Sequence, residues 1–187
     1  LPDEWAADSL TTRWELPRLI ERLLVDDDDA QQGAAATIVT RMGRNLGHVL
    51  LALHRGDPVN RAVRPEWGEA EWARWAAVRG VWLAGGLASG RVGAGIVRYA
   101  TEWLHSVGYR GAPDIAASPF AADTALVGAA RYLPPNAGPC LCCDFGQTSV
   151  KRGLFTVEGR AVAQYLPLPR AAGLEPPAAD LIPIEVA

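Results

Sequence analysis

The fold of this chain is indicated most strongly by the stretch Asp144-Phe145-Gly146-Gln147-Thr148-Ser149-Val150-Lys151-Arg152-Gly153. The stretch joins two segments with the composition of strands, residues 140–143 and 149–157. A third such segment, residues 160–166, follows after the tight turn Glu158-Gly159. The sequence therefore predicts a small antiparallel sheet whose first turn contains a glycine.

The residue types in this first turn suit the binding of phosphate. Gly146 lets the backbone approach phosphate oxygens, and the turn amides and the Thr148 hydroxyl can donate hydrogen bonds to them. Asp144, at a strand end, is suited to hold Mg²⁺ through water, because magnesium keeps most of its water and takes only one or two carboxylates. Lys151 or Arg152 is suited to face the phosphates, but strand alternation sends the two to opposite sides. The alternative is an ordinary β-turn in which Asp and Gly serve the backbone geometry alone.

The stretch resembles the first phosphate motif of the actin/hexokinase superfold, an Asp-x-Gly-x-Thr followed by a basic residue, and the flanking strands resemble its opening hairpin. Within that superfold, residues 141–169 look most like the start of a sugar kinase of the ROK family (repressor, open reading frame, kinase). The resemblance implies a ribonuclease H-like (actin-like ATPase) α/β fold, with a mixed sheet and flanking helices, and implies ATP and Mg²⁺ as cofactors. The residues that it implies at the nucleotide are Asp144, Gly146, Gln147, Thr148 and Lys151, with Asp144 at the metal.

A second part of the chain resembles the C-terminal half of ROK proteins. The segments that carry this resemblance are a predicted helix at residues 34–54, the stretch Val81-Trp82-Leu83-Ala84-Gly85-Gly86-Leu87-Ala88-Ser89, and the stretch Asp123-Thr124-Ala125-Leu126-Val127-Gly128-Ala129-Ala130. In the family a glycine pair lies against adenosine, a role that the resemblance gives to Gly85 and Gly86. By itself such a pair also suits a plain strand-to-helix turn.

The two resemblances occur in the reverse of the family's order. We therefore expect three parts: residues 1–133, similar to the C-terminal half of a ROK kinase; a junction at 134–139; and residues 140–187, with the phosphate-type hairpin and a tail. A circular permutation or a junction between two kinase-like modules explains this order. Because the first residue is Leu1 and the only methionine is Met42, we also expect the sequence to be processed or a segment of a longer one.

The chain departs from the family where the sugar would bind. The family's catalytic Asp lies in an Asn-Asp context, and neither that pair nor the Glu-x-Gly-His sugar motif, the cysteine-rich zinc motif or the second phosphate loop occurs here. We therefore expect a protein related to ATP-dependent sugar kinases, with no identified catalytic residue, that does not phosphorylate sugars by itself. The alternative is a non-catalytic module that senses sugar or acts as a scaffold.

The composition indicates a folded protein and argues against nucleic acid or a membrane surface as its partner. Hydrophobic residues make up 49% and charged residues 21% of the 187 residues, which predicts a folded chain. The net charge of −3 offers no basic field for nucleic acid or a membrane surface. Three clustered cysteines (Cys140, Cys142 and Cys143) predict buried small strand residues in a reducing, cytoplasmic protein and not a disulfide framework. Strand alternation predicts that Cys143 points away from the other two, so no zinc site is expected. The partners we expect are a small sugar, and a second copy of the chain or a missing domain.

The remaining elements follow from periodicity. Apolar spacing predicts helices at residues 10–24 and 34–54, with the acidic run 26–29 as a loop before the second helix. Gly43 and Gly47, four residues apart on that helix, predict close approach of another backbone.

After a loop, a short helix is predicted to begin near Pro65, and strands are predicted at residues 78–84 and 114–117. A further helix is predicted to begin at Ser118-Pro119 and to end before Pro134. We expect both strands to join the later three in one mixed sheet. The tail from Pro167, which contains several prolines, is predicted to be a loop.

Overall fold

The computed structural model describes residues 10–145 and 149–172. The chain forms two compact units, the first ending at Ala122 and the second beginning at Asp123. Each unit is α/β, and each has its own sheet and hydrophobic core. No helix among the described residues is both long enough and apolar enough to cross a membrane.

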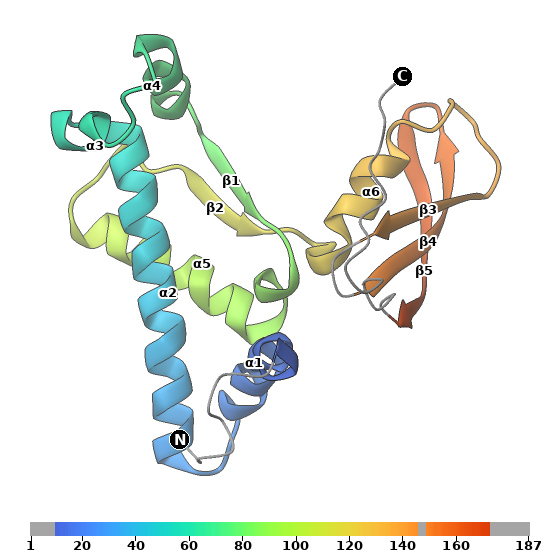
Figure 1. Ribbon diagram of the computed structural model, residues 1–187, viewed down its shortest axis with the longest axis horizontal. Coiled ribbons are helices and arrows are strands. Elements are labelled where there is room, and N and C mark those ends of the chain that lie inside the picture. Colours follow the sequence, from blue (N-terminus) through green and yellow to red (C-terminus); the bar gives the residue numbers. More distant parts are fainter. Residues whose placement is uncertain (1–9, 146–148, 173–187) are drawn as a thin grey trace, which may run out of the picture. The chain divides into compact units, whose positions relative to one another are not determined.

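The first unit is built on two crossing helices and a short parallel sheet (Figure 1). Its elements are α1 (Leu10–Leu23), α2 (Asp29–Arg55), α3 (Pro58–Ala62), α4 (Glu69–Ala76), β1 (Gly80–Leu83), the 3-10 turn η2 (Gly86–Ala88), α5 (Gly90–Ser106) and β2 (Asp114–Ala117). Strands β1 and β2 pair in parallel, with Gly80 opposite Asp114. The core lies where α1, α2 and α5 meet, and its buried members are Ile20, Ala35, Val39, Val92 and Ile96.

Helix α2 has a capping residue at each end, Asp28 before its first residue and Gly56 after its last. Asp28 caps its N-terminus, because the Asp28 carboxylate accepts hydrogen bonds from the amides of Ala30 and Gln31. Gly56 ends the helix in the left-handed conformation, with φ of 52°. The predicted helix is thus confirmed, but it begins at Asp29, five residues earlier than predicted, so the acidic loop before it is shorter than expected.

Glycine brings α2 close to α5, as predicted. A Cβ added at Gly43 would lie 2.6 Å from the Tyr99 Cβ, and one at Gly47 would lie 2.7 Å from the Trp103 ring. Both distances are far below van der Waals contact, so no larger residue fits at either position without moving α5.

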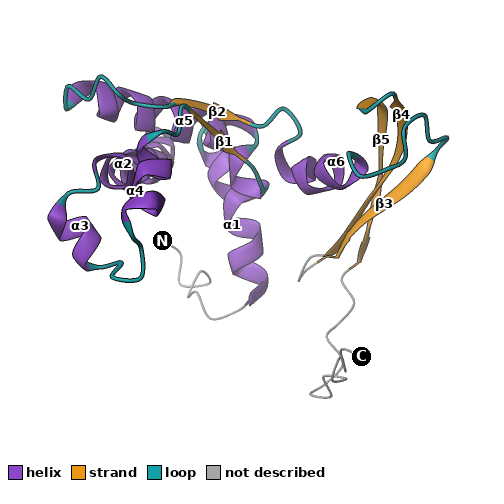
Figure 2. Cartoon of the chain, turned by 90° about the horizontal axis from the view of Figure 1, so that it is seen from above, coloured by secondary structure: helices purple, strands orange, loops and turns teal. Residues whose placement is uncertain are grey.

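The second unit packs one short helix on a three-stranded antiparallel sheet (Figure 2). Its elements are η3 (Ala121–Asp123), which spans the boundary, α6 (Thr124–Ala130), β3 (Cys140–Phe145), β4 (Ser149–Glu158) and β5 (Ala161–Ala172), in the sheet order β3-β4-β5. Leu126 and Ala130 of α6 pack on Cys142 and Phe155. The Phe155 ring stacks on Tyr165 of β5, with ring centroids 4.7 Å apart.

Several sequence predictions need correction. The expectation of one mixed sheet is wrong for the described strands, which form a two-stranded and a separate three-stranded sheet. Helix α6 begins six residues later than predicted, since Ser118 still donates its amide to Leu83 O (2.7 Å) and so continues the strand pairing. The short helix predicted near Pro65 is α4, which begins at Glu69, and the loop predicted before it contains a further short helix, α3.

Strand β5 also runs further than predicted, through Pro167 and Pro169 to Ala172. Proline lacks the amide that a central strand needs, but β5 is an edge strand and has only one pairing partner. The compact units divide at residues 122 and 123, so α6 packs with the hairpin, whereas the resemblance groups residues 123–133 with the preceding segment.

Candidate functional site

The end of the hairpin where β3 finishes and β4 begins brings two predicted site residues together. Asp144 and Lys151 are directly opposite in the strand register, and the Lys151 Nζ lies 3.1 Å from the Asp144 Oδ2. Both side chains are about three-quarters buried, with 29% of Asp144 and 23% of Lys151 exposed. The other residues predicted for this turn, Gly146, Gln147 and Thr148, lie outside the described residues.

Strand alternation determines which basic residue lies on the same face of the sheet as Asp144. Lys151 faces the α6 side of the sheet with Asp144, whereas Arg152 donates from NH2 to Pro169 O (2.8 Å) across the strand pair. The prediction that the two basic residues face opposite sides is confirmed, and Lys151 is the one beside the carboxylate.

The chemistry of Asp144 fits a hydrated Mg²⁺ better than a dehydrated metal. Among the described residues, no group of three or more His, Cys, Asp or Glu side chains can hold a metal ion. Magnesium needs only one or two carboxylates and keeps several waters, so a single carboxylate at a strand end suffices. The Lys151 ammonium already balances this carboxylate, and a metal would have to share or replace that contact.

The three cysteines near this pair are structural. Cys142 is buried under α6, and burial raises the pKa of its thiol, which keeps it protonated. Cys143 is exposed on the opposite face, as strand alternation predicted, so the prediction that the cysteines are buried is confirmed for Cys142 and wrong for Cys143; the three thiols are free.

The other predicted site residues, Gly85 and Gly86, form the turn between β1 and α5 in the first unit. Gly85 has φ of 97° and ψ of 179°, a conformation that is essentially restricted to glycine. Gly86 is exposed, and a Cβ added at either glycine would meet no atom within 4 Å. The turn thus presents bare backbone, which a flat group can approach closely.

A residue that the sequence reasoning missed occupies the helix end beside this turn. The Glu21 carboxylate of α1 accepts hydrogen bonds from the amides of Arg91 (2.8 Å) and Val92 (3.0 Å) in the first turn of α5. These amides are the usual place for a phosphate at a strand–glycine–helix turn, and here a side-chain anion fills it. Glu21 and Arg91 are 70 positions apart in the sequence, so no local pattern indicates this contact.

A small cavity of about 250 Å³ lies at the same turn, lined by Pro17, Arg18, Glu21, Gly86, Ser89, Gly90 and Val92. The Ser89 hydroxyl donates to Gly86 O (2.8 Å) and holds the turn closed on itself. Because an acid fills the helix end and backbone forms one wall, this place suits a neutral planar group better than a phosphate.

Two candidate general bases, Asp57 and His54, have structural contacts in the first unit. Asp57 forms an ion pair with Arg55 (3.1 Å). His54, which the sequence reasoning did not consider as a base, is 5% exposed, and its Nδ1 lies 3.4 Å from the Tyr109 hydroxyl. Burial and the nearby Arg79 charge lower the pKa of His54, so it stays neutral in the core at neutral pH. We assign no catalytic base.

The two groups of site residues belong to different units: Gly85 and Gly86 to the first, Asp144 and Lys151 to the second. No protein-family model matches the chain, and neither do curated protein sequences or solved structures.

Proposed function

We propose that this chain carries the nucleotide-handling parts of an ATP-dependent sugar kinase of the ROK type, with a ribonuclease H-like (actin-like ATPase) fold. The reaction is transfer of the ATP γ-phosphoryl group to a sugar hydroxyl in the cytoplasm. The observation that carries the proposal is the Asp144–Lys151 pair, which joins a carboxylate and an ammonium at the end of a hairpin that resembles the first phosphate motif.

The proposed roles follow from the chemistry of each residue. Asp144 accepts hydrogen bonds from the water shell of Mg²⁺, which neutralises phosphate charge when bound. Lys151, whose flexible stem carries three donors, moves from Asp144 to the phosphates. Gly146, Gln147 and Thr148 supply the donors of the turn. Gly85 and Gly86 offer bare backbone to adenosine, and the cavity beside Gly86 has room for part of a planar group.

The separate sheets support a junction of two kinase-like modules over a circular permutation. In a permuted single module, the hairpin strands would join the sheet that contains β1 and β2, and among the described strands they do not. The sugar-binding half and the catalytic base then belong to another domain or to a second copy of the chain.

Calorimetry with Mg-ATP tests the proposal. We expect Asp144→Ala to weaken Mg²⁺-dependent nucleotide binding at least tenfold with little loss of stability, because it removes a metal contact and opens no core cavity. Glu158→Ala, an exposed acid at the far end of β4, is the matched control and should bind as the parent does. Equal binding by Asp144→Ala and the parent, or collapse of its thermal stability, would contradict the assignment.

A second substitution tests the nucleoside position separately. Gly86→Leu places a side chain in the open space at the β1–α5 turn and should weaken ATP binding at least tenfold. Gly33→Leu in α2, where an added Cβ also meets nothing within 4 Å, is its control. If Gly86→Leu binds ATP normally, the nucleoside lies elsewhere, whatever the result at Asp144.

The same ion pair also favours the second candidate function, a non-catalytic sugar-sensing or scaffold module. A carboxylate that is balanced within the fold stabilises the hairpin without any ligand. Sugar binding with no measurable binding of Mg-ATP would support this alternative.

A further inference from the structure

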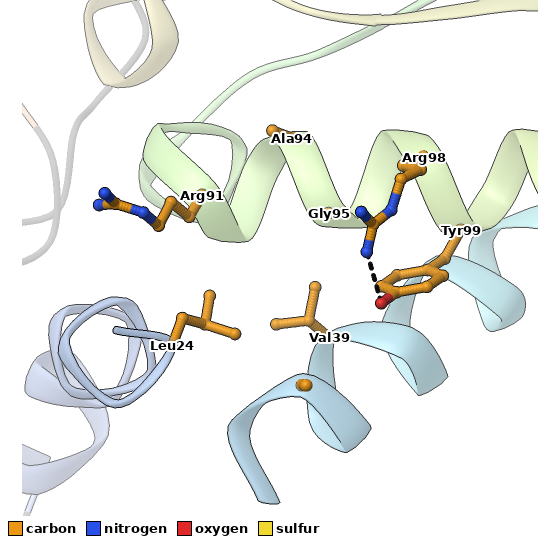
Figure 3. Close-up of a pocket in the computed structure, with 8 residues that line it drawn as sticks. Leu24, Val39, Arg91, Ala94, Gly95, Arg98 and Tyr99 are labelled. Carbon is orange, nitrogen blue, oxygen red and sulfur yellow. Dashed lines mark hydrogen bonds between the residues drawn. The ribbon is translucent and has the colours of Figure 1, made fainter. Parts of the chain in front are cut away.

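A larger cavity of about 390 Å³ lies between α1, α2 and α5 in the first unit (Figure 3). Apolar groups from all three segments form its floor, among them Leu24 after α1, Val39 of α2 and Gly95 of α5. Its rim carries the side chains of Arg91, Arg98 and Tyr99 from α5. Its volume falls within the range typical of small-ligand pockets, about 300 to 1,000 Å³.

Small residues on α5 keep this cavity open. A Cβ added at Gly95 would lie 2.5 Å from the Val39 Cγ1, so only glycine lets Val39 lie against the α5 backbone. Ala94, the next residue on α5, also lines the cavity and fills little of it. The result is a smooth apolar floor beside a helix that carries two cations.

The arginine charges at the rim are only partly balanced. Arg91 NH1 lies 3.9 Å from Glu21, and Arg98 Nε lies 3.8 Å from Glu102, both longer than a hydrogen bond. The two arginine side chains are 64% and 61% exposed, respectively. Each guanidinium therefore keeps donors free to reach an anion.

Arg98 and Tyr99 form a single polar unit at one end of the cavity. The Arg98 guanidinium lies 4.4 Å from the Tyr99 ring centroid and donates from NH2 to the Tyr99 hydroxyl, as Figure 3 shows. Stacking on the ring holds the planar guanidinium in place, which lowers the entropy lost when it binds an anion.

We infer that this cavity binds a small organic anion, a phosphate or carboxylate carried on an apolar group. The anionic group is held by Arg98 and the Tyr99 hydroxyl, and the apolar group lies on Leu24, Val39 and Gly95. Arginine matches both oxyanions through paired N–H donors, and the floor residues Leu24, Val39 and Gly95 carry no polar side-chain group. The inference does not depend on the proposed kinase function, since none of these residues is among those proposed to contact the nucleotide or its metal.

Titration calorimetry on the full chain tests this with phenyl phosphate and benzoate, and with phenol and inorganic phosphate as the separate halves of the ligand. We expect at least one of the two organic anions to bind about tenfold or more tightly than either half. Arg98→Gln should weaken that binding about tenfold. Arg44→Gln, an exposed arginine on α2 outside the cavity, should leave it unchanged.

Ala94→Phe provides a test that keeps both arginines, because it fills the cavity from its exposed side and should abolish binding. If Arg98→Gln lowers the thermal midpoint of unfolding, its loss of affinity is not specific, and the result for Ala94→Phe then tests the inference. The inference is overturned if neither organic anion binds more tightly than its halves, if Ala94→Phe binds as the parent does, or if Arg44→Gln loses as much affinity as a folded Arg98→Gln.

Discussion

The glycine turn of the first unit and the hairpin end of the second present opposite kinds of surface. Gly85 and Gly86 carry no side chains, so the turn exposes its backbone. The Glu21 carboxylate beside the turn accepts hydrogen bonds from two amides of α5. At the hairpin end, Asp144 and Lys151 place a carboxylate and an ammonium 3.1 Å apart. The first place suits a neutral planar group, and the second suits phosphate and its metal.

The two places also depend on different parts of the fold. The glycine turn depends on the local conformation of Gly85, whereas the Asp144–Lys151 pair depends on strand register and on the core beneath the sheet. Substitutions in the core of the second unit should therefore have the largest effect on the hairpin end, and substitutions in the turn should act locally.

The largest effect is expected for Phe155→Ala. Phe155 is 1% exposed, packs under α6 and stacks on Tyr165, so its removal leaves a cavity under the hairpin. We expect a loss of about 3 to 5 kcal/mol in the free energy of unfolding of the second unit, measured by urea denaturation. Phe145→Ala, 75% exposed on β3, is the control and should change it by less than about 0.5 kcal/mol. Similar losses in both variants would show that α6 does not form the core of this unit.

A smaller effect is expected for Gly85→Ala. The backbone of Gly85 lies at φ of 97° and ψ of 179°, so alanine should cost about 1 to 3 kcal/mol in thermal or urea unfolding of the first unit. Gly86→Ala meets no neighbouring atom and should change stability by less than about 0.5 kcal/mol. Equal costs at the two glycines would mean that the strain of the turn is not confined to Gly85.

The smallest effect is expected for the Asp144–Lys151 interaction. In a double-mutant cycle with Asp144→Asn and Lys151→Met, we expect a coupling energy of about 1 kcal/mol, because both side chains keep some contact with water. Urea denaturation of the four proteins measures it. A coupling above about 3 kcal/mol would describe a fixed structural pair, and Lys151 would then not leave Asp144 for a phosphate.

Much of the local structure was predictable from the residues themselves. Helical periodicity predicted α1 and α2, the acidic run predicted the loop before α2, and the two-residue turn at Glu158-Gly159 predicted the pairing of β4 with β5. The close packing of α2 on α5 was predictable because Gly43 and Gly47 lie on one face. The start of α6 was not, because backbone pairing of Ser118 with Leu83 overrides the capping signal at Ser118-Pro119.

The sequence by itself determined which residues have the chemistry for a site: Asp144 and Lys151 at a strand end, and the glycine pair 85–86 after a short strand. Only the tertiary structure decided that Lys151 and not Arg152 faces Asp144, that Glu21 fills the α5 helix end, and that the five strands form two sheets. The physical reason is the distance along the chain over which each kind of interaction acts. Propensity, capping and alternation act over a few residues, whereas Glu21 and the first turn of α5 are 70 positions apart and meet only once the core has formed. Asp144 and Lys151 are only seven positions apart, but their register depends on the length of the connection between β3 and β4 and on the packing of the sheet against α6.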